Sequence, residues 1–137
     1  MDFEGHCSPL AWVANKIRRK VGSTMAAETV IMLQAVDHAF FLRSLLSEIV
    51  NKESGCFEMI AISDSKNLVE NIQSVHQPKD HRLRLEIAQL QEHVRKGLKL
   101  LHSPGGSQLA DPLTKRPASS ALLLECLNSG KLPEQWQ

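Results

Sequence analysis

The spacing of apolar residues along the chain predicts strands and helices in alternation. Residues 10–17 roughly alternate apolar side chains with small or polar ones, which is typical of a strand. Apolar residues at helical spacing predict a helix that starts with Met25 and runs to about Val50, and a hydroxyl of Ser23 or Thr24 can cap it. The apolar positions of this helix occupy more than half of its circumference, so we expect a sheet to cover most of it.

Polar breaks divide the rest of the chain into shorter elements. Residues 56–63 are almost continuously apolar and predict a buried strand that ends at Asp64. Apolar residues at positions 83, 87, 90 and 94 indicate an amphipathic helix closed by Gly97. The predicted order after the first two elements is strand 56–63, helix 65–75, helix 81–96, strand 98–103 and helix 119–128. Strands and helices that alternate in this way predict an α/β fold.

Size and charge narrow the classes of protein that fit this pattern. The chain has 137 residues, of which 42% are hydrophobic and 23% charged, which suits one soluble domain and excludes a multidomain enzyme. A formal charge of +1 excludes a histone-like protein that coats a polyanion. Aromatic residues make up 4%, with no Tyr, which leaves little surface for stacking single-stranded bases.

The sequence also predicts where the protein resides. We find no apolar run that approaches the roughly 20 residues needed to cross a bilayer, and the N-terminus is acidic where a signal peptide would be basic. Cys7, Cys56 and Cys126 form no CxxC pair, which fits a reducing compartment, so we expect them to be buried or incidental thiols. We therefore expect an intracellular protein, cytoplasmic or nuclear, without membrane contact.

Three acidic residues stand where elements begin or end. We expect Glu28 in the first turn of the long helix, Asp64 after a buried strand and Asp111 after the loop that follows the last strand. Ligands of α/β sheets bind beyond the carboxyl ends of the strands, and grouped carboxylates are the usual ligands of Mg²⁺. Each acid alone is better explained structurally: Glu28 by the helix dipole and Asp64 as a helix cap.

A short basic run precedes the long helix, and it allows two interpretations of similar weight. Its cations could contact a phosphate backbone, or they could form a solvated turn. The run consists of Lys16, Arg18, Arg19 and Lys20.

Four strings of residues occur in the order and approximate spacing of one known family. The chain resembles the ribonuclease H domain of copia-type retrotransposon polyproteins, over nearly its whole length from Ser8 to about Lys131. The most specific strings are the Ala-Glu helix start and the Gln-Leu-Ala-Asp-x-Leu-Thr-Lys string. The four strings span residues 23–29, 41–48, 63–68 and 106–115.

The resemblance implies a truncated ribonuclease H-like fold, with a mixed sheet flanked by helices in residues 1–131 and a polar tail in residues 132–137. The family cleaves RNA in RNA/DNA hybrids, using one Glu and three Asp to hold two Mg²⁺ ions at the scissile phosphate. Glu28, Asp64 and Asp111 match three of these four acids. The basic run would hold backbone phosphate.

The chain departs from the family at its start. The family's first aspartate lies on an opening strand, well before the residues matched by Ser8, and Asp2 is not its equivalent. In the family this aspartate bridges both metals, so we expect weak or absent Mg²⁺ binding and no activity from this chain alone. The strand at 56–63 would also have an open edge that permits self-association. The alternative is a non-catalytic remnant that binds nucleic acid or a protein through that edge.

Overall fold

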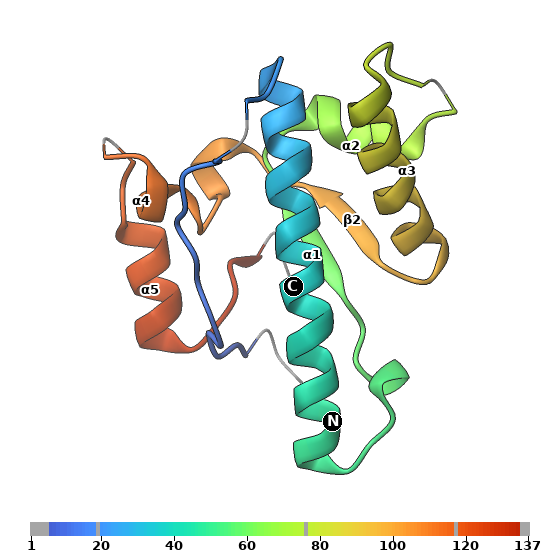
Figure 1. Ribbon diagram of the computed structural model, residues 1–137. Coiled ribbons are helices and arrows are strands. Elements are labelled where there is room, and N and C mark those ends of the chain that lie inside the picture. The colour runs from blue at the N-terminus through green and yellow to red at the C-terminus, as the bar shows by residue number, and fades with distance from the viewer. Residues whose placement is uncertain (1–5, 19, 76, 117, 135–137) are drawn as a thin grey trace. The chain divides into compact units, whose positions relative to one another are not determined.

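The chain folds into two compact units. The computed structural model describes residues 6–18, 20–75, 77–116 and 118–134 (Figure 1). One unit spans residues 19–103, and the other combines the two ends of the chain, residues 1–18 and 104–137. The described residues are largely helical with a small parallel sheet, so the predicted combination of helices and strands is confirmed.

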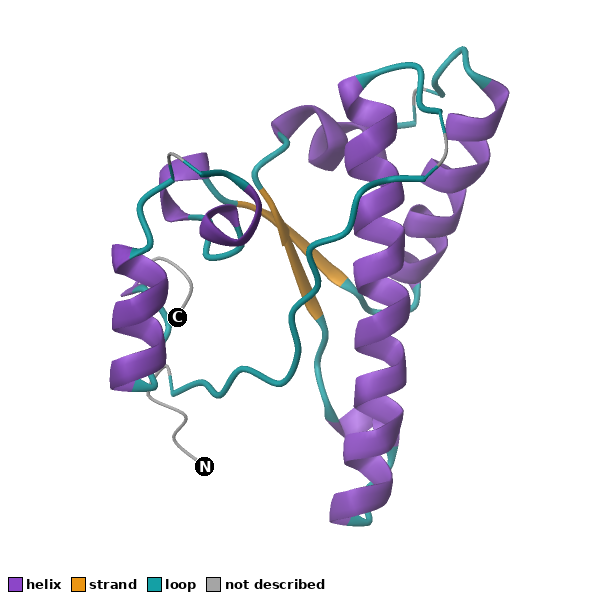
Figure 2. Ribbon diagram, turned by 60° about the vertical axis from the view of Figure 1, so that its left-hand side comes forward, coloured by secondary structure: helices purple, strands orange, loops and turns teal. Residues whose placement is uncertain are grey.

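The order of the elements follows the predicted order from residue 24 onward. In the described residues, both strands of the sheet belong to unit 19–103, together with three helices (Figures 1 and 2). Unit 19–103 contains α1 (Thr24–Val50), a 3-10 turn (Ser54–Cys56), β1 (Ile60–Ser63), α2 (Lys66–Gln73), α3 (His81–Arg95) and β2 (Lys99–His102). The unit of the chain ends contains a 3-10 turn (Gly105–Ser107), α4 (Asp111–Thr114) and α5 (Ala121–Ser129).

The sheet consists of β1 and β2, which run parallel. Ala61 pairs with Leu100 and Ser63 with His102. Parallel strands need a long crossover connection, and here α2 and α3 supply it. An ion pair between Lys99 and Glu58 joins the start of β2 to the residues before β1.

Local side-chain contacts explain where the helices start and stop. The Ser23 hydroxyl accepts a hydrogen bond from the Ala26 amide at 3.1 Å, which confirms the predicted cap of α1. The Asp80 carboxylate accepts from the amides of Arg82 and Leu83 at the start of α3. Gly97 follows α3 with φ 109°, a left-handed conformation that side chains disfavour and glycine adopts freely.

The core of unit 19–103 lies between α1, α2, α3 and one face of the sheet. Its largest fully buried hydrophobic side chains are Leu68, Leu90 and Val36, one from each helix. Leu100 packs into the same cluster from β2. The helices therefore contribute more of this core than the strands do.

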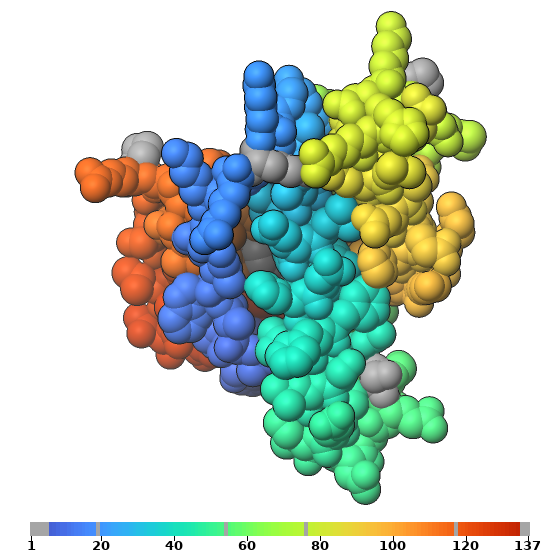
Figure 3. Space-filling view, in the orientation of Figure 1, coloured from blue at the N-terminus to red at the C-terminus, as the bar shows by residue number. Residues whose placement is uncertain are grey.

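The predicted covering of α1 by a sheet is wrong. A helix of 27 residues is about 40 Å long, whereas the sheet of the described residues has two strands of four residues each. The helix instead packs on α3 and α2 along one side. Its remaining surface leaves several large apolar side chains exposed: Ile31, Phe41, Leu45, Ile49 and Val50. Figure 3 shows the surface of this helix in blue to green.

The expectation that no apolar segment could span a bilayer also needs correction. By length and mean hydropathy, α1 qualifies as a candidate membrane-crossing helix. The core helix of a soluble protein meets the same criteria, so the composition of α1 does not assign the protein to either environment.

Two strand predictions differ from the structure. Residues 10–17 form no strand, because a strand exists only when a neighbour accepts its backbone hydrogen bonds and the described part of the chain pairs none with this segment. The strand predicted at 56–63 is limited to Ile60–Ser63, since Cys56 ends a 3-10 turn and the pairing partner begins only at Lys99.

Replacement of Asp80 by Ala tests the importance of the α3 cap. The Asp80→Ala variant loses two hydrogen bonds and a negative charge near the helix N-terminus, so we expect the free energy of unfolding to fall by about 0.5–2 kcal/mol. Urea unfolding followed by circular dichroism measures the change. The control is Asp37→Ala, which removes an exposed carboxylate from α1, away from any helix end; an equal loss there would contradict the cap assignment.

Candidate functional site at the ends of the parallel strands

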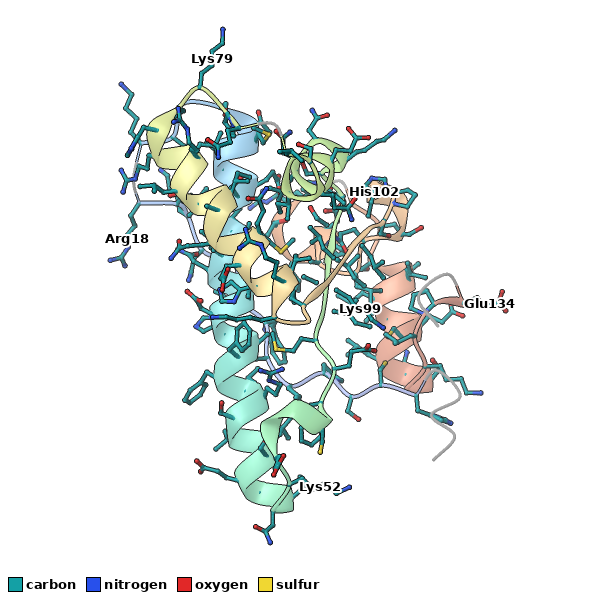
Figure 4. All side chains as sticks on the ribbon, turned by 90° about the vertical axis from the view of Figure 1, so that its right-hand side faces the viewer. Arg18, Lys52, Lys79, Lys99, His102 and Glu134 are labelled. Atoms are coloured by element: carbon teal, nitrogen blue, oxygen red, sulfur yellow. The ribbon has the colours of Figure 1, made fainter. Side chains whose placement is uncertain are left out.

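Because β1 and β2 are parallel, their carboxyl ends meet at one edge of the sheet. Ser63 lies beside His102 in the register, and the Ser103 amide donates to the Ser63 carbonyl at 2.9 Å. Both serine side chains are buried. His102 is exposed and ends β2, opposite Lys99 at its start (Figure 4). The edge is thus a small polar region directly beyond the strands.

Asp64 lies in this region, directly after β1. The Ser65 hydroxyl caps α2 by accepting from the Leu68 amide, and the Ser63 hydroxyl accepts from the Ser65 amide at 3.1 Å. The N-cap residue of α2 is therefore Ser65, the residue after Asp64. Asp64 is half-buried between the strand and the helix.

Glu28 lies in the second turn of α1, one turn later than predicted, because the helix begins at Thr24. The favourable effect of the helix dipole on a carboxylate fades after the first turn, which weakens that explanation of Glu28. Figures 1 and 2 show α1 beginning at the end of unit 19–103 where β1 and β2 finish. Glu28 and Asp64 are therefore at the same end of this unit, and both are half-buried.

Asp111 belongs to the unit of the chain ends, where it begins α4. Its carboxylate forms an ion pair with Lys115, with 2.9 Å between Oδ1 and Nζ. The lysine comes from the same Gln-Leu-Ala-Asp-x-Leu-Thr-Lys string as the aspartate. Ion pairs between residues four positions apart stabilise a helix by a few tenths of a kcal/mol. This contribution explains the pairing of Asp111 with Lys115 without any ligand.

The carboxylates that the structure describes form no group of the size that a metal centre needs. Among the residues that the structure describes, no group of three or more His, Cys, Asp or Glu side chains could hold a metal ion. A two-metal centre needs several carboxylates around both ions. The residues present therefore do not fit the two Mg²⁺ ions that the resemblance implies, and the chemistry of such ions is not assigned to this chain.

The basic run has no regular structure. Lys16, Arg18 and Lys20 are exposed, while Arg19 lies outside the described residues. Exposed cations can bind a phosphate backbone or simply be solvated, so both interpretations of the run stay open.

A cation and two rings between α1 and α3 have no counterpart in the sequence predictions. The Arg43 guanidinium lies 4.8 Å from the centroid of the Phe40 ring, whose own centroid is 4.9 Å from that of His93. Arg43 Nε and His93 Nδ1 are buried and make no hydrogen bond to the described part of the chain. Arg43 lies in one of the four resembling strings, but its role depends on α1 packing against α3, which the sequence pattern did not predict.

The residues at this site thus supply two carboxylates at one end of a unit, and a third that is ion-paired in the other unit. What they do has to be inferred from the chain itself. No protein-family model, curated protein or solved structure was found to match it.

Proposed function

We propose that the chain is part of a ribonuclease H-like domain derived from a copia-type retrotransposon polyprotein. The complete domain would cleave the RNA strand of an RNA/DNA hybrid. The observation that carries the proposal is that Asp64 directly follows β1, one of two parallel strands, while Glu28 lies in the second turn of α1 in the same unit. The four strings of sequence that resemble the family support it independently.

Glu28 and Asp64 would provide carboxylates at the reaction centre, joined by Asp111. The basic run, Lys16, Arg18, Arg19 and Lys20, would neutralise backbone phosphates of the hybrid. The family's first aspartate has no equivalent in the sequence, and the acids present assemble no metal site among the described residues. We therefore propose that this chain alone is inactive and that Mg²⁺ belongs to the complete domain.

The ion pair of Asp111 does not oppose this role. The Lys115 side chain is 54% exposed and that of Asp111 18%, so the pair is partly exposed, and ion pairs exposed to solvent contribute about 1 kcal/mol or less.

Restoring the first aspartate tests the proposal. A hairpin bearing this residue, taken from a copia-type polyprotein, is fused ahead of residue 1. We expect the fusion protein to cleave the RNA strand of a hybrid in the presence of Mg²⁺, and Asp64→Asn to abolish that cleavage. The matched control is Asp37→Asn, an exposed acid on α1 that should retain the activity.

Two outcomes would overturn this proposal. One is a fusion protein that folds, as judged by circular dichroism, and still does not cleave the hybrid. The other is undiminished cleavage by the Asp64→Asn fusion after repeated purification has removed contaminating nucleases.

A second candidate function is a non-catalytic remnant that binds nucleic acid or a protein. It is favoured by the small sheet, which in the described residues has only two strands and leaves Ile60 and Leu101 half-exposed. Another strand could add to such a sheet, from a partner or from a second copy of the chain. The genomic sequence upstream of Met1 separates the two candidates: an in-frame strand bearing Asp favours the enzyme, and a stop codon favours the remnant. Either function would be exercised inside the cell, in the cytoplasm or nucleus.

A further inference from the structure

The unit of the chain ends is built differently from unit 19–103. The members of the main hydrophobic cluster come from residues 19–103, and among the described residues of the other unit Cys126 is the one buried hydrophobic residue. An antiparallel bridge between His6 and Lys131 brings the two ends together. Next to it, the Cys7 amide donates to the Gly130 carbonyl at 2.6 Å. Among the described residues, backbone pairing rather than apolar packing joins these ends.

The same contact brings two thiols together. The Sγ atoms of Cys7 and Cys126 are 3.3 Å apart and hydrogen-bonded, although the residues are 119 positions apart in the sequence. Cys126 is only 7% exposed, whereas Cys7 is half-buried. A disulfide bond joins sulfurs at about 2.05 Å, so closing one would require these two sulfurs to approach by more than about 1 Å. The expectation of buried or incidental thiols is confirmed for Cys126, which is buried, but it did not include the contact of Cys126 with Cys7.

We propose that Cys7 and Cys126 form a redox modification site that reacts with small-molecule disulfides and closes an internal disulfide bond. In the first step the Cys7 thiolate attacks one sulfur of the small disulfide, forming a mixed disulfide and releasing one small thiol. Cys126 then attacks the Cys7 sulfur and releases the second small thiol. The two protein thiols are oxidised, the small disulfide is reduced to two thiols, and the two protons pass to those thiols.

The surroundings of the two sulfurs determine which reacts first. Burial, together with the hydrogen bond to Cys7, raises the pKa of the Cys126 thiol to about 11. Cys126 is therefore almost fully protonated at neutral pH, and a protonated thiol is a poor nucleophile. Cys7, the more exposed of the two, meets the small disulfide first, and Cys126 resolves the mixed disulfide from the adjacent position.

Closing this bond would link the two ends of the chain covalently. The described backbone contacts between the ends are few, whereas a disulfide that closes a loop of this length removes much of the conformational freedom of the unfolded chain. We expect oxidation to raise the midpoint of thermal unfolding of this unit by about 10 °C.

Cys56 provides an internal comparison. It is exposed in the 3-10 turn of unit 19–103, so reaction with a small disulfide should leave it as a mixed disulfide that a reductant removes. In an unfolded chain, Cys56 would pair with Cys7 or with Cys126 more readily than Cys7 pairs with Cys126. The loops that Cys56 closes are both shorter than the loop between Cys7 and Cys126.

The test uses residues 1–137 treated with oxidised glutathione, in the folded state and in urea. Free thiols are then alkylated, and the unreduced protein is digested and mapped by mass spectrometry. We expect the folded protein to yield the peptide pair that links Cys7 to Cys126, and the protein in urea to yield mainly links to Cys56. The Cys56→Ser variant should still form the internal bond, while Cys7→Ser and Cys126→Ser should not.

The mapping decides the proposal even where a variant fails to fold, because the unaltered chain and Cys56→Ser suffice. The proposal would be overturned if the folded protein formed disulfide links to Cys56. It would also be overturned if Cys56 were oxidised while Cys7 and Cys126 were both recovered in the alkylated form. A mixed disulfide on Cys7 that never proceeds to the internal bond would overturn it as well.

Discussion

Purified residues 1–137 are expected to cleave no RNA/DNA hybrid, with either Mg²⁺ or Mn²⁺. No group of three potential ligands is assembled among the described residues, and the aspartate that bridges the metals in the resembling family has no equivalent in the sequence. Removing one member of a set of groups that act together lowers kcat by on the order of 10⁴-fold or more. We therefore expect the chain to fall at least that far below the fusion protein in a gel assay of hybrid cleavage.

A contaminating nuclease is the main source of false activity, so the Glu28→Gln variant is prepared in parallel. Equal residual cleavage by both proteins would identify contamination. Multiple-turnover cleavage by a monomer, lost in Glu28→Gln, would contradict the prediction and mean that another acid replaces the absent one. Asp2 and Glu4, which lie outside the described residues, are the nearest candidates in the sequence.

Truncation of Leu90 is expected to cause the largest loss of stability. This side chain is 1% exposed in α3 and packs into the cluster that joins α1, α2 and β2. Leu90→Ala removes its packing and leaves a cavity, which costs about 2–5 kcal/mol. Since a domain of this size is stable by only about 5–15 kcal/mol, we expect the urea midpoint of α-helical circular dichroism to fall sharply.

Leu85→Ala provides the matched control on the same helix. Leu85 is 57% exposed and contributes little apolar surface to the core. Its truncation should therefore change stability by less than about 0.5 kcal/mol. Similar losses for both variants would show that the cluster around Leu90 does not stabilise the unit.

The helices were more predictable than the strands because a helix forms its hydrogen bonds within itself. The apolar spacing and Gly97 predicted α3 to within one residue at its end, and the hydroxyl of Ser23 predicted the start of α1. A strand needs a partner that its own sequence does not specify. Residues 10–17 carry a strand pattern without a partner among the described residues, and only half of 56–63 is paired.

The position of Asp64 was predictable because it depends on one local boundary, the end of β1. The pairing of Asp111 with Lys115 was not expected, because α4 itself was not predicted. No local signal relates Cys7 to Cys126, since their contact depends on the two chain ends meeting. Contacts between distant parts of the chain therefore account for most of what the sequence did not reveal.

The pairing of His6 with Lys131 affects the order in which the molecule can be assembled. Contacts that close large loops form late, because the entropy of closure must be lost before any contact compensates for it. During translation, Cys7 emerges 119 residues ahead of Cys126, which corresponds to roughly 10 s at ordinary synthesis rates. For that interval Cys56 is the thiol of residues 1–125 with which Cys7 could pair wrongly, so a reducing environment during synthesis protects the correct pairing of the ends.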